Sequence, residues 1–552
     1  MEPKPHNVQR TVHPAATPDI ESGISESQKV DPILAKVVSL HLDGRLVDAL
    51  KELRQAISSH SREPSLLSAA GRLLCELHEY PQAAEVYSQL LKLQPQHRTA
   101  EFNRAVCLAK MERWQDASTG FEICIRANPA QLEAQLGLGT CLLRLEQPAK
   151  AFQAFGQYLE HHPKHEEALF GSAVALQQMG RAKEARSVYA RILAANPASQ
   201  ESLINLTELS LSEHEYQEVQ KHAQALLELD STALEALEAL AAASFATSDF
   251  AAAIEYCERL LRIKPDHFET WYNLGVAHQK LSNFKRASEA YAFAAQSRPD
   301  SVDAQVSLGI VLHKLGDLST ARTAYQRAVE LNPKHPGALW NLGLVLEQMG
   351  EKGQAEVLYS MLPPDDPESA EATFRVGYLR LLRGDFRGGV EAFSACLGKK
   401  PGWLEAQLNL GIAAWKAGEL AAAREAFQAV LAARANSLDA LRGLAALSLA
   451  EGDQTEAFRL HRQLIDSGER SPEVYYNCGL ICHNRGEVRD ATLMYREALK
   501  IDPNFAEALL NLGHALMYVG AKDEARACWR RAISLRPELA RGYFDSDNNG
   551  AA

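Results

Sequence analysis

The chain lacks the features of several large protein classes. Its first 29 residues contain no apolar run of the kind that a secretory signal needs. None of its segments approaches the ~20 apolar residues of a membrane span. The net charge is −12, and no basic stripe is present that could neutralise nucleic-acid phosphates. We therefore expect no secretory signal, no membrane insertion and no nucleic-acid partner.

Cysteine is scarce, and no two cysteines have the spacing of a known paired-cysteine motif. The sequence has nine cysteines, an odd number, and no CxxC pair. This usage is more typical of a reduced intracellular protein than of a secreted protein stapled by disulfides. The sequence therefore predicts a cytoplasmic protein.

Motifs for common enzyme chemistry are also missing. We find no P-loop, no GxGxxG after a strand, no GxSxG and no HExxH. The histidines of "HHPKH" (His161, His162 and His165) lie in a predicted turn without the further ligands that a zinc site requires. Cys478 and Cys482 fall on core places of a predicted helix, as small apolar fillers do. With 29 residues before the repeats and 13 after them, we expect no catalytic domain, no catalytic residues, no metal and no cofactor.

The sequence does contain a period of 34 residues. From Val30 to Leu539 it divides into fifteen blocks without an insertion or deletion, and we number the places in each block 1 to 34. Place 8 is Gly or Ala in thirteen blocks, and place 20 is Ala in thirteen. Place 24 is Phe, Tyr or Trp in eleven blocks, and place 32 is Pro in eleven. Such a period is the signature of a repeat architecture.

Each block predicts two helices of about 12–15 residues joined by a short turn. Places 4, 7, 8 and 11 share one face of the first helix, and places 20, 24 and 27 share one face of the second. Small residues at places 8 and 20 let the two backbones approach closely. A single pair of helices cannot bury its apolar face, so stacked pairs must share one core. The sequence therefore predicts an all-α solenoid of about fifteen helix-turn-helix repeats.

The spacing resembles the tetratricopeptide repeat family. The clearest block contains "TWYNLG", with Trp271, Leu274 and Gly275 in the W-x2-L-G pattern, followed by Ala287 and Pro299. The resemblance covers residues 30–539. It implies a right-handed superhelix whose concave groove is lined by places 2, 5, 6, 9, 12 and 13 of the first helices.

Asparagine recurs at place 6, on the surface that the resemblance assigns to the groove. A row of amides, each with a donor pair and an acceptor, could hold an extended peptide backbone, and the repeat arm of O-linked N-acetylglucosamine transferases has a similar row. Aromatic residues recur beside them at place 5. The alternative is that asparagine is common at this place and faces water, while the aromatics are half-buried against the next block. The predicted groove residues are Asn103, Asn205, Asn273, Asn341, Asn409, Asn477, Asn511, Tyr272, Trp340 and Tyr476.

Two regions depart from the regular pattern. Pro363 falls where other blocks are still helical, so the helix before it should end near Met361. Gly389 then occupies place 20 of the next block, and together they predict a soft joint near residues 360–392. Outside the blocks, residues 1–29 read as a disordered tail and residues 540–552 as a short C-terminal tail. No polar capping helix follows the last block, so we expect that either Tyr543 and Phe544 or a partner, such as a second copy of the chain, covers that end.

These observations predict a non-catalytic scaffold or adaptor that binds a peptide or a partner protein in its groove. Two alternatives remain open. The chain could be a substrate-selecting arm of a separately encoded enzyme, such as a glycosyltransferase, or a sensor that responds to a peptide or metabolite.

Overall fold

The protein is described by a computed structural model that covers residues 27–59, 63–97 and 99–540. Within these residues it contains thirty α-helices and no strand, two helices for each block. The predicted all-α fold is confirmed. Residues 1–26 of the predicted N-terminal tail and residues 541–552 of the predicted C-terminal tail lie outside the described residues. The first helix begins at Ser27, three residues before the first block.

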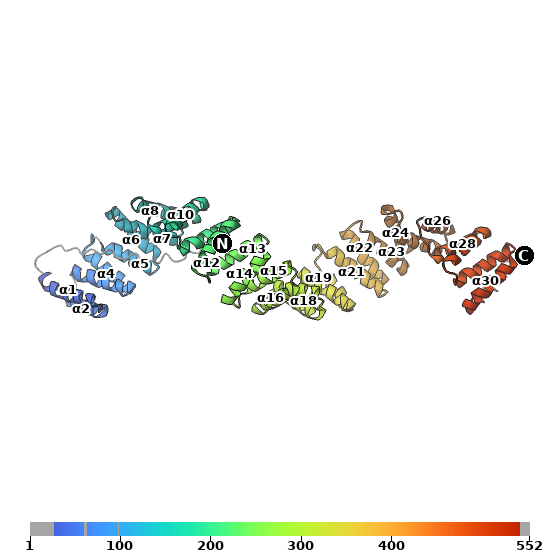
Figure 1. Cartoon of the computed structure of the whole chain (residues 1–552), viewed down its shortest axis with the longest axis horizontal. Coiled ribbons are helices and arrows are strands. Elements are labelled where there is room, and N and C mark those ends of the chain that lie inside the picture. The colour runs from blue at the N-terminus through green and yellow to red at the C-terminus, as the bar shows by residue number, and fades with distance from the viewer. Residues whose placement is uncertain (1–26, 60–62, 98, 541–552) are drawn as a thin grey trace. The chain divides into compact units, whose positions relative to one another are not determined.

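The chain divides into two units, Met1–Leu281 and Ser282–Ala552. The first unit runs from blue to green in Figure 1. Its helices are α1 Ser27–Leu42, α2 Leu46–Ser59, α3 Pro64–Glu76, α4 Tyr80–Leu93, α5 Ala100–Lys110, α6 Trp114–Ala127, α7 Leu132–Arg144, α8 Pro148–His161, α9 Glu166–Gln178, α10 Ala182–Ala195, α11 Gln200–Ser212, α12 Tyr216–Leu229, α13 Leu234–Ala246, α14 Phe250–Ile263 and α15 Phe268–Lys280.

The second unit continues the same alternation of helices to the C-terminal end of the described chain. Its helices are α16 Phe284–Ser297, α17 Val302–Lys314, α18 Leu318–Leu331, α19 Pro336–Gln348, α20 Lys352–Ser360, α21 Ser369–Leu382, α22 Phe386–Lys399, α23 Leu404–Ala417, α24 Leu420–Ala433, α25 Leu438–Ala450, α26 Gln454–Asp466, α27 Pro472–Asn484, α28 Val488–Ile501, α29 Ala506–Tyr518 and α30 Lys522–Leu535, followed by a 3-10 turn at Pro537–Leu539.

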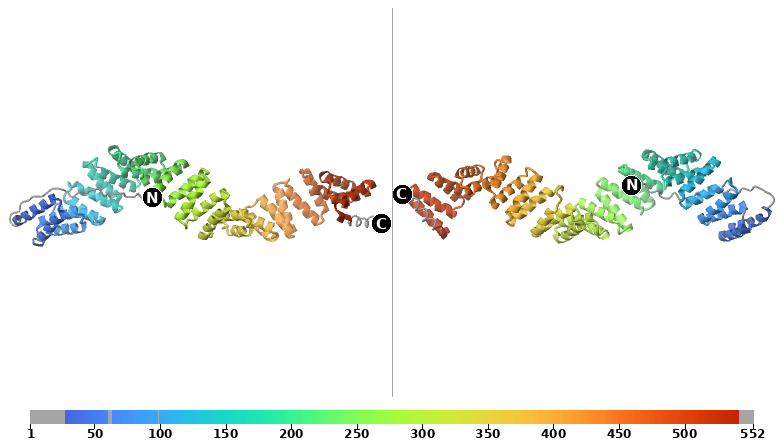
Figure 2. Two further views of the ribbon diagram at one scale, coloured as in Figure 1. Left: turned by 60° about the horizontal axis from the view of Figure 1, so that its bottom comes forward. Right: turned by 180° about the vertical axis from the view of Figure 1, so that it is seen from behind.

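Within each unit, every helix packs against the helices next to it in sequence, and first helices of neighbouring blocks also touch, as α21 and α23 do. Figure 2 shows this succession of paired helices from two further directions. Among the described helices, the main contacts all join helices that are one or two apart in the chain. This nearest-neighbour packing is that of an α-solenoid, in which each repeat is stabilised by the repeats beside it.

The aromatic ring at place 24 joins one block to the next. Phe155 is fully buried on α8. A Cβ added to Gly139, at place 8 of the same block, would lie 2.7 Å from the ring. A Cβ added to Gly171, at place 6 of the next block, would also clash with that ring. The Phe155 ring is therefore enclosed by the first helices of two blocks, and its size sets their separation.

The turn between the two helices of each block has the same backbone conformation throughout. Place 15 has a positive φ in all fifteen blocks, and glycine occupies it in nine, Gly180 and Gly350 among them. The other six residues at this place are His78, Glu112, Glu146, His214, Ser248 and Ser282. This conformation suits glycine and is costly for residues with a Cβ.

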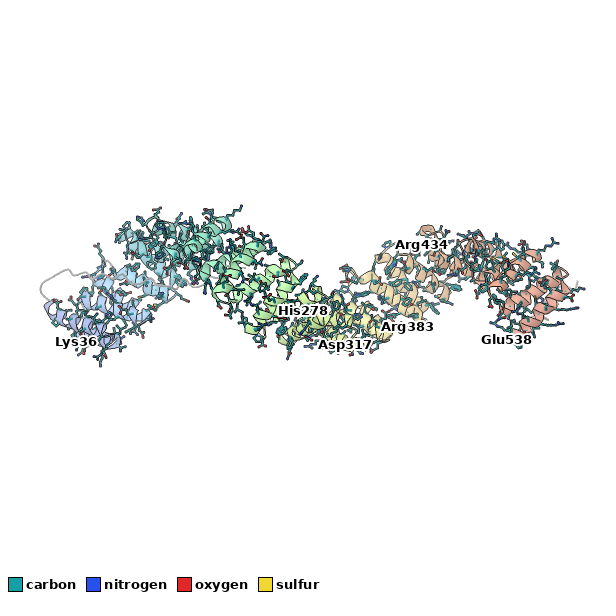
Figure 3. The ribbon with its side chains drawn as sticks, in the orientation of Figure 1. Lys36, His278, Asp317, Arg383, Arg434 and Glu538 are labelled. Atoms are coloured by element: carbon teal, nitrogen blue, oxygen red, sulfur yellow. The ribbon has the colours of Figure 1, made fainter. Side chains whose placement is uncertain are left out.

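Helix α20 ends early, as the sequence predicted. It stops at Ser360, with Met361 as its C-cap, after only nine residues. A hollow of about 290 Å³ lies beyond it, lined by residues of α21 and α22 as well as by Tyr359 and Leu362. Glu356 on α20 accepts hydrogen bonds from Arg380 and from Arg383, which is labelled in Figure 3. The soft joint near residues 360–392 lies inside the second unit and stays a prediction.

Candidate functional site

We call places 2, 5, 6, 9, 12 and 13 of the first helices the inner surface. Side chains at these places meet across neighbouring blocks. His41 of α1 contacts Glu76 of α3 with 2.6 Å between Nε2 and Oε2, from place 12 to place 13 of the next block. In the second unit, His313 and Gln348 repeat this relation at 3.0 Å. The inner surface is therefore continuous along each of these pairs of blocks.

The seven asparagines do not share one environment. Asn103 and Asn205 are buried, with 9% and 3% of their surface exposed. Asn273 is exposed, and the other four (Asn341, Asn409, Asn477 and Asn511) are half-buried. Place 6 lies beside place 24 of the preceding block, as Gly171 lies beside Phe155. Asn103 shows this directly, because its Nδ2 donates to the hydroxyl of Tyr87, 3.2 Å away.

Most of these amides are already hydrogen-bonded within the chain. Three donate from Nδ2 to a carbonyl of their own helix: Asn205 to Glu201 at 2.9 Å, Asn341 to Gly337 at 2.7 Å and Asn409 to Glu405 at 2.8 Å. Asn511 donates to the hydroxyl of Tyr476 at 2.9 Å. A side-chain amide has two N–H donors and one carbonyl acceptor, so a single bond fixes its orientation and leaves the acceptor for another group.

The three predicted aromatic residues are half-buried and packed on one side. Tyr272 stacks on Phe268 of the same helix, with ring centroids 6.0 Å apart. The ring centroid of Tyr476 lies 5.0 Å from that of Phe505 and 5.9 Å from that of Tyr495. Burial raises the pKa of the Tyr476 phenol. These rings are packed against aromatic neighbours of their own block while keeping part of their surface open.

Trp340 belongs to a cluster that sequence reasoning did not recognise. Its ring lies 5.4 Å from that of Tyr359 and 5.5 Å from the guanidinium of Arg375. Arg375 takes the place of asparagine in its block and forms an ion pair with Glu347 at 3.0 Å. Glu347 also accepts from the hydroxyl of Tyr359 at 3.0 Å. The only sequence signal was the spacing, because Glu347 at place 12 precedes Arg375 at place 6 of the next block.

Exposed apolar side chains follow this cluster on the inner surface. On α21, Tyr378 is 41% exposed and Leu382 is 52% exposed. Leu344 on α19 and Ile412 on α23 hold the same place as Tyr378 and are half-buried. We call these four residues the inner strip. Sequence reasoning missed Tyr378 and Leu382, because exposure depends on neighbours from other blocks.

The residues weighed as metal or thiol sites have structural roles. His165 caps α9 by accepting from the backbone N–H of Ala168 at 3.3 Å. Cys478 and Cys482 are buried on α27, and burial raises the pKa of their thiols to about 12 and about 11. Among the described residues, no three His, Cys, Asp or Glu side chains are grouped to hold a metal ion. No helix in the same part of the chain is long and apolar enough to cross a membrane.

Comparison with known families agrees with the repeat geometry. A family model described as "Tetratricopeptide repeat" matches just over half of the chain, at residues 68–117, 108–160, 212–268, 272–336 and 408–472. The chain belongs to the tetratricopeptide repeat family. A second model of the same description matches residues 142–204 and 312–373. The model of the "Cilia and flagella-associated protein 70 middle TPR-like domain" matches residues 441–543.

Solved structures are similar to the chain over different shares of its length. MamA is 24% identical with a TM-score of 0.28, covering 30% of this chain and 97% of that chain. YrrB, described as "a TPR protein with an unusual peptide-binding site", is 22% identical with a TM-score of 0.31, covering 34% and 96%. The structure of Naa15/Naa10 bound to HypK-THB is 11% identical with a TM-score of 0.32, covering 95% and 98%. Scores of this size carry no argument about the partners of this chain. A search of curated proteins gives no match.

Membership of the family places the chain among scaffolds that are generally non-catalytic. Stacked repeats of this kind present an extended surface that other proteins bind. Which residues take part differs from one repeat protein to the next, because the scaffold does not determine the site.

Proposed function

We propose that the inner strip binds an apolar segment of a partner protein and that the chain acts as an adaptor in a multiprotein complex. One observation carries this proposal. Tyr378 and Leu382 expose 41% and 52% of their surface side by side on one helix. Exposed apolar side chains that are contiguous mark interaction sites more often than isolated ones do. Tyrosine is also among the residues that contribute most to binding energy at interfaces.

The surroundings of the inner strip favour an apolar partner segment over a charged one. Arg375, a cation beside the inner strip on α21, is already paired with Glu347 and covered by Trp340 on its other side. For Arg375 to bind an acidic segment, its ion pair with Glu347 would have to break, and the Glu347 carboxylate would lose its partner at a cost in free energy. An apolar segment can instead bury the exposed side chains at no electrostatic cost.

The asparagines at the edges of the inner strip add backbone recognition. Asn341 and Asn409 each use one N–H within their own helix, which orients the amide. Their Oδ1 atoms can then accept from backbone N–H groups of the bound segment. This role differs from that of a row of seven free amides, because Asn103 and Asn205 are buried. Asn477 belongs to a later block of the second unit and would serve a longer segment.

Site-specific crosslinking tests the proposal most directly. A photoreactive residue is placed at Tyr378 in the full chain, and a matched one at Glu425, which is exposed on the second helix α24. We expect a defined partner peptide to crosslink at position 378 and not at 425. Equal crosslinking at both positions, or crosslinking at 425 alone, would overturn the proposed site. A transferase activity that co-purifies with the crosslinked partner would favour the enzyme-arm alternative.

The same partner allows an affinity test. Tyr378→Ala combined with Leu382→Ala should weaken binding at least tenfold, about 1.4 kcal/mol. Leu493 provides a matched control, because it is 54% exposed on the second helix α28. Leu493→Ala should leave the affinity unchanged. If the control weakens binding as much as the double variant does, the inner strip is not the binding site.

Self-association is a second partner class, and one observation favours it. Tyr518, on the inner surface of the last block, is 80% exposed, and Val519 beside it is 44% exposed. We propose that these side chains pair two copies of the chain. Sedimentation of the wild type should show a concentration-dependent dimer, and Tyr518→Ser should reduce it. A wild type that stays monomeric at high concentration would contradict this proposal.

A further inference from the structure

Two cysteines from consecutive blocks lie close together in the first unit. The Sγ atoms of Cys75 on α3 and Cys107 on α5 are 3.2 Å apart, and the residues are 32 apart in sequence. Both thiols are free, as are the other seven cysteines. A disulfide has an S–S length of about 2.05 Å. The two sulfur atoms are therefore unbonded but need to approach by only about 1 Å to form that bond.

The two thiols have different surroundings, as a reactive cysteine and its resolving partner require. Cys75 is half-buried at place 12, on the inner surface, and Cys107 is fully buried. The hydrogen bond with Cys107 lowers the pKa of the Cys75 thiol. Burial opposes that shift, and a hydrogen bond with the Tyr87 phenol adds to it. The pKa of the Cys107 thiol is raised, first by its hydrogen bond with Cys75 and then by burial.

Tyr87 is held in position for this contact. Its ring is buried against Gly71, where an added Cβ would lie 2.7 Å from the ring. The Nδ2 of Asn103 donates to its hydroxyl. The phenol proton of Tyr87 is thus directed away from Asn103 and is free to stabilise a thiolate at Cys75. The asparagine at place 6 therefore has a role here that differs from peptide binding.

We propose that Cys75 and Cys107 form a reversible disulfide that links α3 covalently to α5 when the protein is exposed to a peroxide. The Cys75 thiolate attacks the peroxide, the O–O bond breaks, and Cys75 becomes a sulfenic acid while hydroxide leaves. The Cys107 sulfur then attacks the Cys75 sulfur, the S–O bond breaks, and the Cys107 proton leaves with the oxygen as water. Two thiols are oxidised by two electrons, and one peroxide is reduced. A dithiol reductant reverses the bond by thiol–disulfide exchange.

The position of this pair determines what the disulfide would do. Cys75 and Cys107 belong to the second and third blocks, which otherwise contact each other only through packing and hydrogen bonds. A covalent bond between their first helices would hold the inner surface there at one spacing. The pair at Cys478 and Cys482 has no such effect, because both lie one turn apart on α27.

Mass spectrometry of the oxidised full chain tests this proposal. Trypsin places Cys75 in the peptide 73–92 and Cys107 in the peptide 105–110, one cysteine in each. After hydrogen peroxide treatment of the folded protein, we expect these peptides to be joined, with a mass lower by two hydrogen atoms than their sum. Dithiothreitol should separate them. The peptide 471–485, which carries both Cys478 and Cys482, should remain reduced under the same treatment.

Three results would overturn the proposal. The first is oxidation of Cys75 to a sulfinic acid without the crosslink. The second is a crosslink at 471–485 that forms as readily as the one between Cys75 and Cys107. The third is a Cys75 that stays reduced in the folded chain while the urea-unfolded chain reacts.

Hydrogen exchange provides a second readout. The disulfide should slow amide exchange in α3 and α5 at least tenfold, because closing a loop removes open states. Cys107→Ser should abolish this slowing, and Cys478→Ser should not. If amide exchange in α3 and α5 of the wild type does not change after the crosslink has formed, the disulfide does not restrict the motion of the two helices. The wild-type mass measurement still decides whether the bond forms if the Cys107 variant fails to fold.

Discussion

Gly411 and the ring of Phe427 are in direct van der Waals contact within one block. A Cβ added to Gly411 would lie 2.6 Å from Cε1 of Phe427, closer than non-bonded carbon atoms pack. Gly443 of the next block lies against the other side of the same ring, where an added Cβ would be 2.5 Å away. Glycine on α23 thus reduces helix propensity in exchange for a close approach of the two helices.

This contact predicts the effect of Gly411→Ala. Alanine should raise helix propensity by about 1 kcal/mol, but the clash with Phe427 should cost about 1–3 kcal/mol. We expect a net loss of stability in a denaturant titration, with faster amide exchange in α23 and α24. Gly398→Ala is the matched control, because Gly398 is helical and nothing lies within 4 Å of an added Cβ. A stabilising Gly411→Ala would show that the ring can move aside.

Alanine in place of glycine should have opposite effects on stability in the turn at place 15 and within a helix. Gly180 has a φ of +73° with open space around it, so Gly180→Ala should cost about 1–2 kcal/mol through backbone strain alone. Gly156 lies within α8, also in open space, and Gly156→Ala should stabilise the protein by up to about 1 kcal/mol. Thermal unfolding of the two variants measures both effects. Shifts of the same sign would contradict the assigned backbone conformation at Gly180.

Glu356 should contribute more to the free energy of unfolding than Glu391, an exposed glutamate beside the same hollow. It is 8% exposed and is bonded to Arg380 Nε at 2.8 Å and Arg383 Nη1 at 2.5 Å. Glu356→Ala would leave Arg380 without its ion-pair partner in a half-buried site, at a cost of about 1–3 kcal/mol. Hydrogen exchange should speed up in α20 and α21. Glu391→Ala, at an exposed position beside the same hollow, should change stability by less than about 0.5 kcal/mol.

The same exchange experiment tests the soft joint. If residues 360–392 form one, the wild type should exchange faster there than in the flanking blocks, and Glu356→Ala should widen the difference. Uniform protection through residues 355–395 of the wild type would count against a joint.

His461 gives the fold a dependence on pH. It occupies place 24, where other blocks have an aromatic ring, and is 3% exposed. Burial lowers the pKa of His461, although its hydrogen bond with the Ala457 carbonyl opposes the shift. The unfolded chain therefore takes up a proton near pH ~6.5, and the folded chain does so only at lower pH. Stability should be fully present above about pH 6.5 and should decrease as the pH falls below it.

His461→Phe should weaken this dependence. Denaturant titrations between about pH 8 and about pH 5.5 would show a smaller loss of stability on acidification than in the wild type. His161→Gln, at an exposed histidine, should leave the wild-type slope unchanged. Identical slopes for the wild type and His461→Phe would mean that His461 is protonated equally in both states.

The regular part of the fold was predictable from the sequence. The period of 34 residues predicts two helices for each block, and the part of the chain that the structure describes forms thirty α-helices in that order. The proline at residue 363 predicted an early end to one helix, and α20 ends at Ser360. These features depend on residues close together in one block, so local sequence is sufficient to predict them.

The candidate site was less predictable, because its character depends on neighbouring blocks. Helical periodicity gives the direction of Asn103 on α5, but not that Tyr87 of the preceding block covers it. Likewise, Arg375 interrupts the asparagine pattern, and only the structure shows that Glu347 pairs with it. Exposure of Tyr378 follows from what the adjacent helices leave uncovered, which no single block encodes.

The enclosure of rings such as Phe155 and Phe427 between two first helices has a consequence for how such a protein can change in length. Phe155 and Phe427 each pack against a glycine at place 6 of the next block, Gly171 and Gly443, at the same spacing along the chain. Excision of residues 404–437 would bring Phe393 opposite Gly443, a combination equivalent to the Phe427 and Gly443 contact it replaces. Gene duplication or loss of whole blocks can therefore lengthen or shorten the protein while seams of this kind keep a fit that already exists.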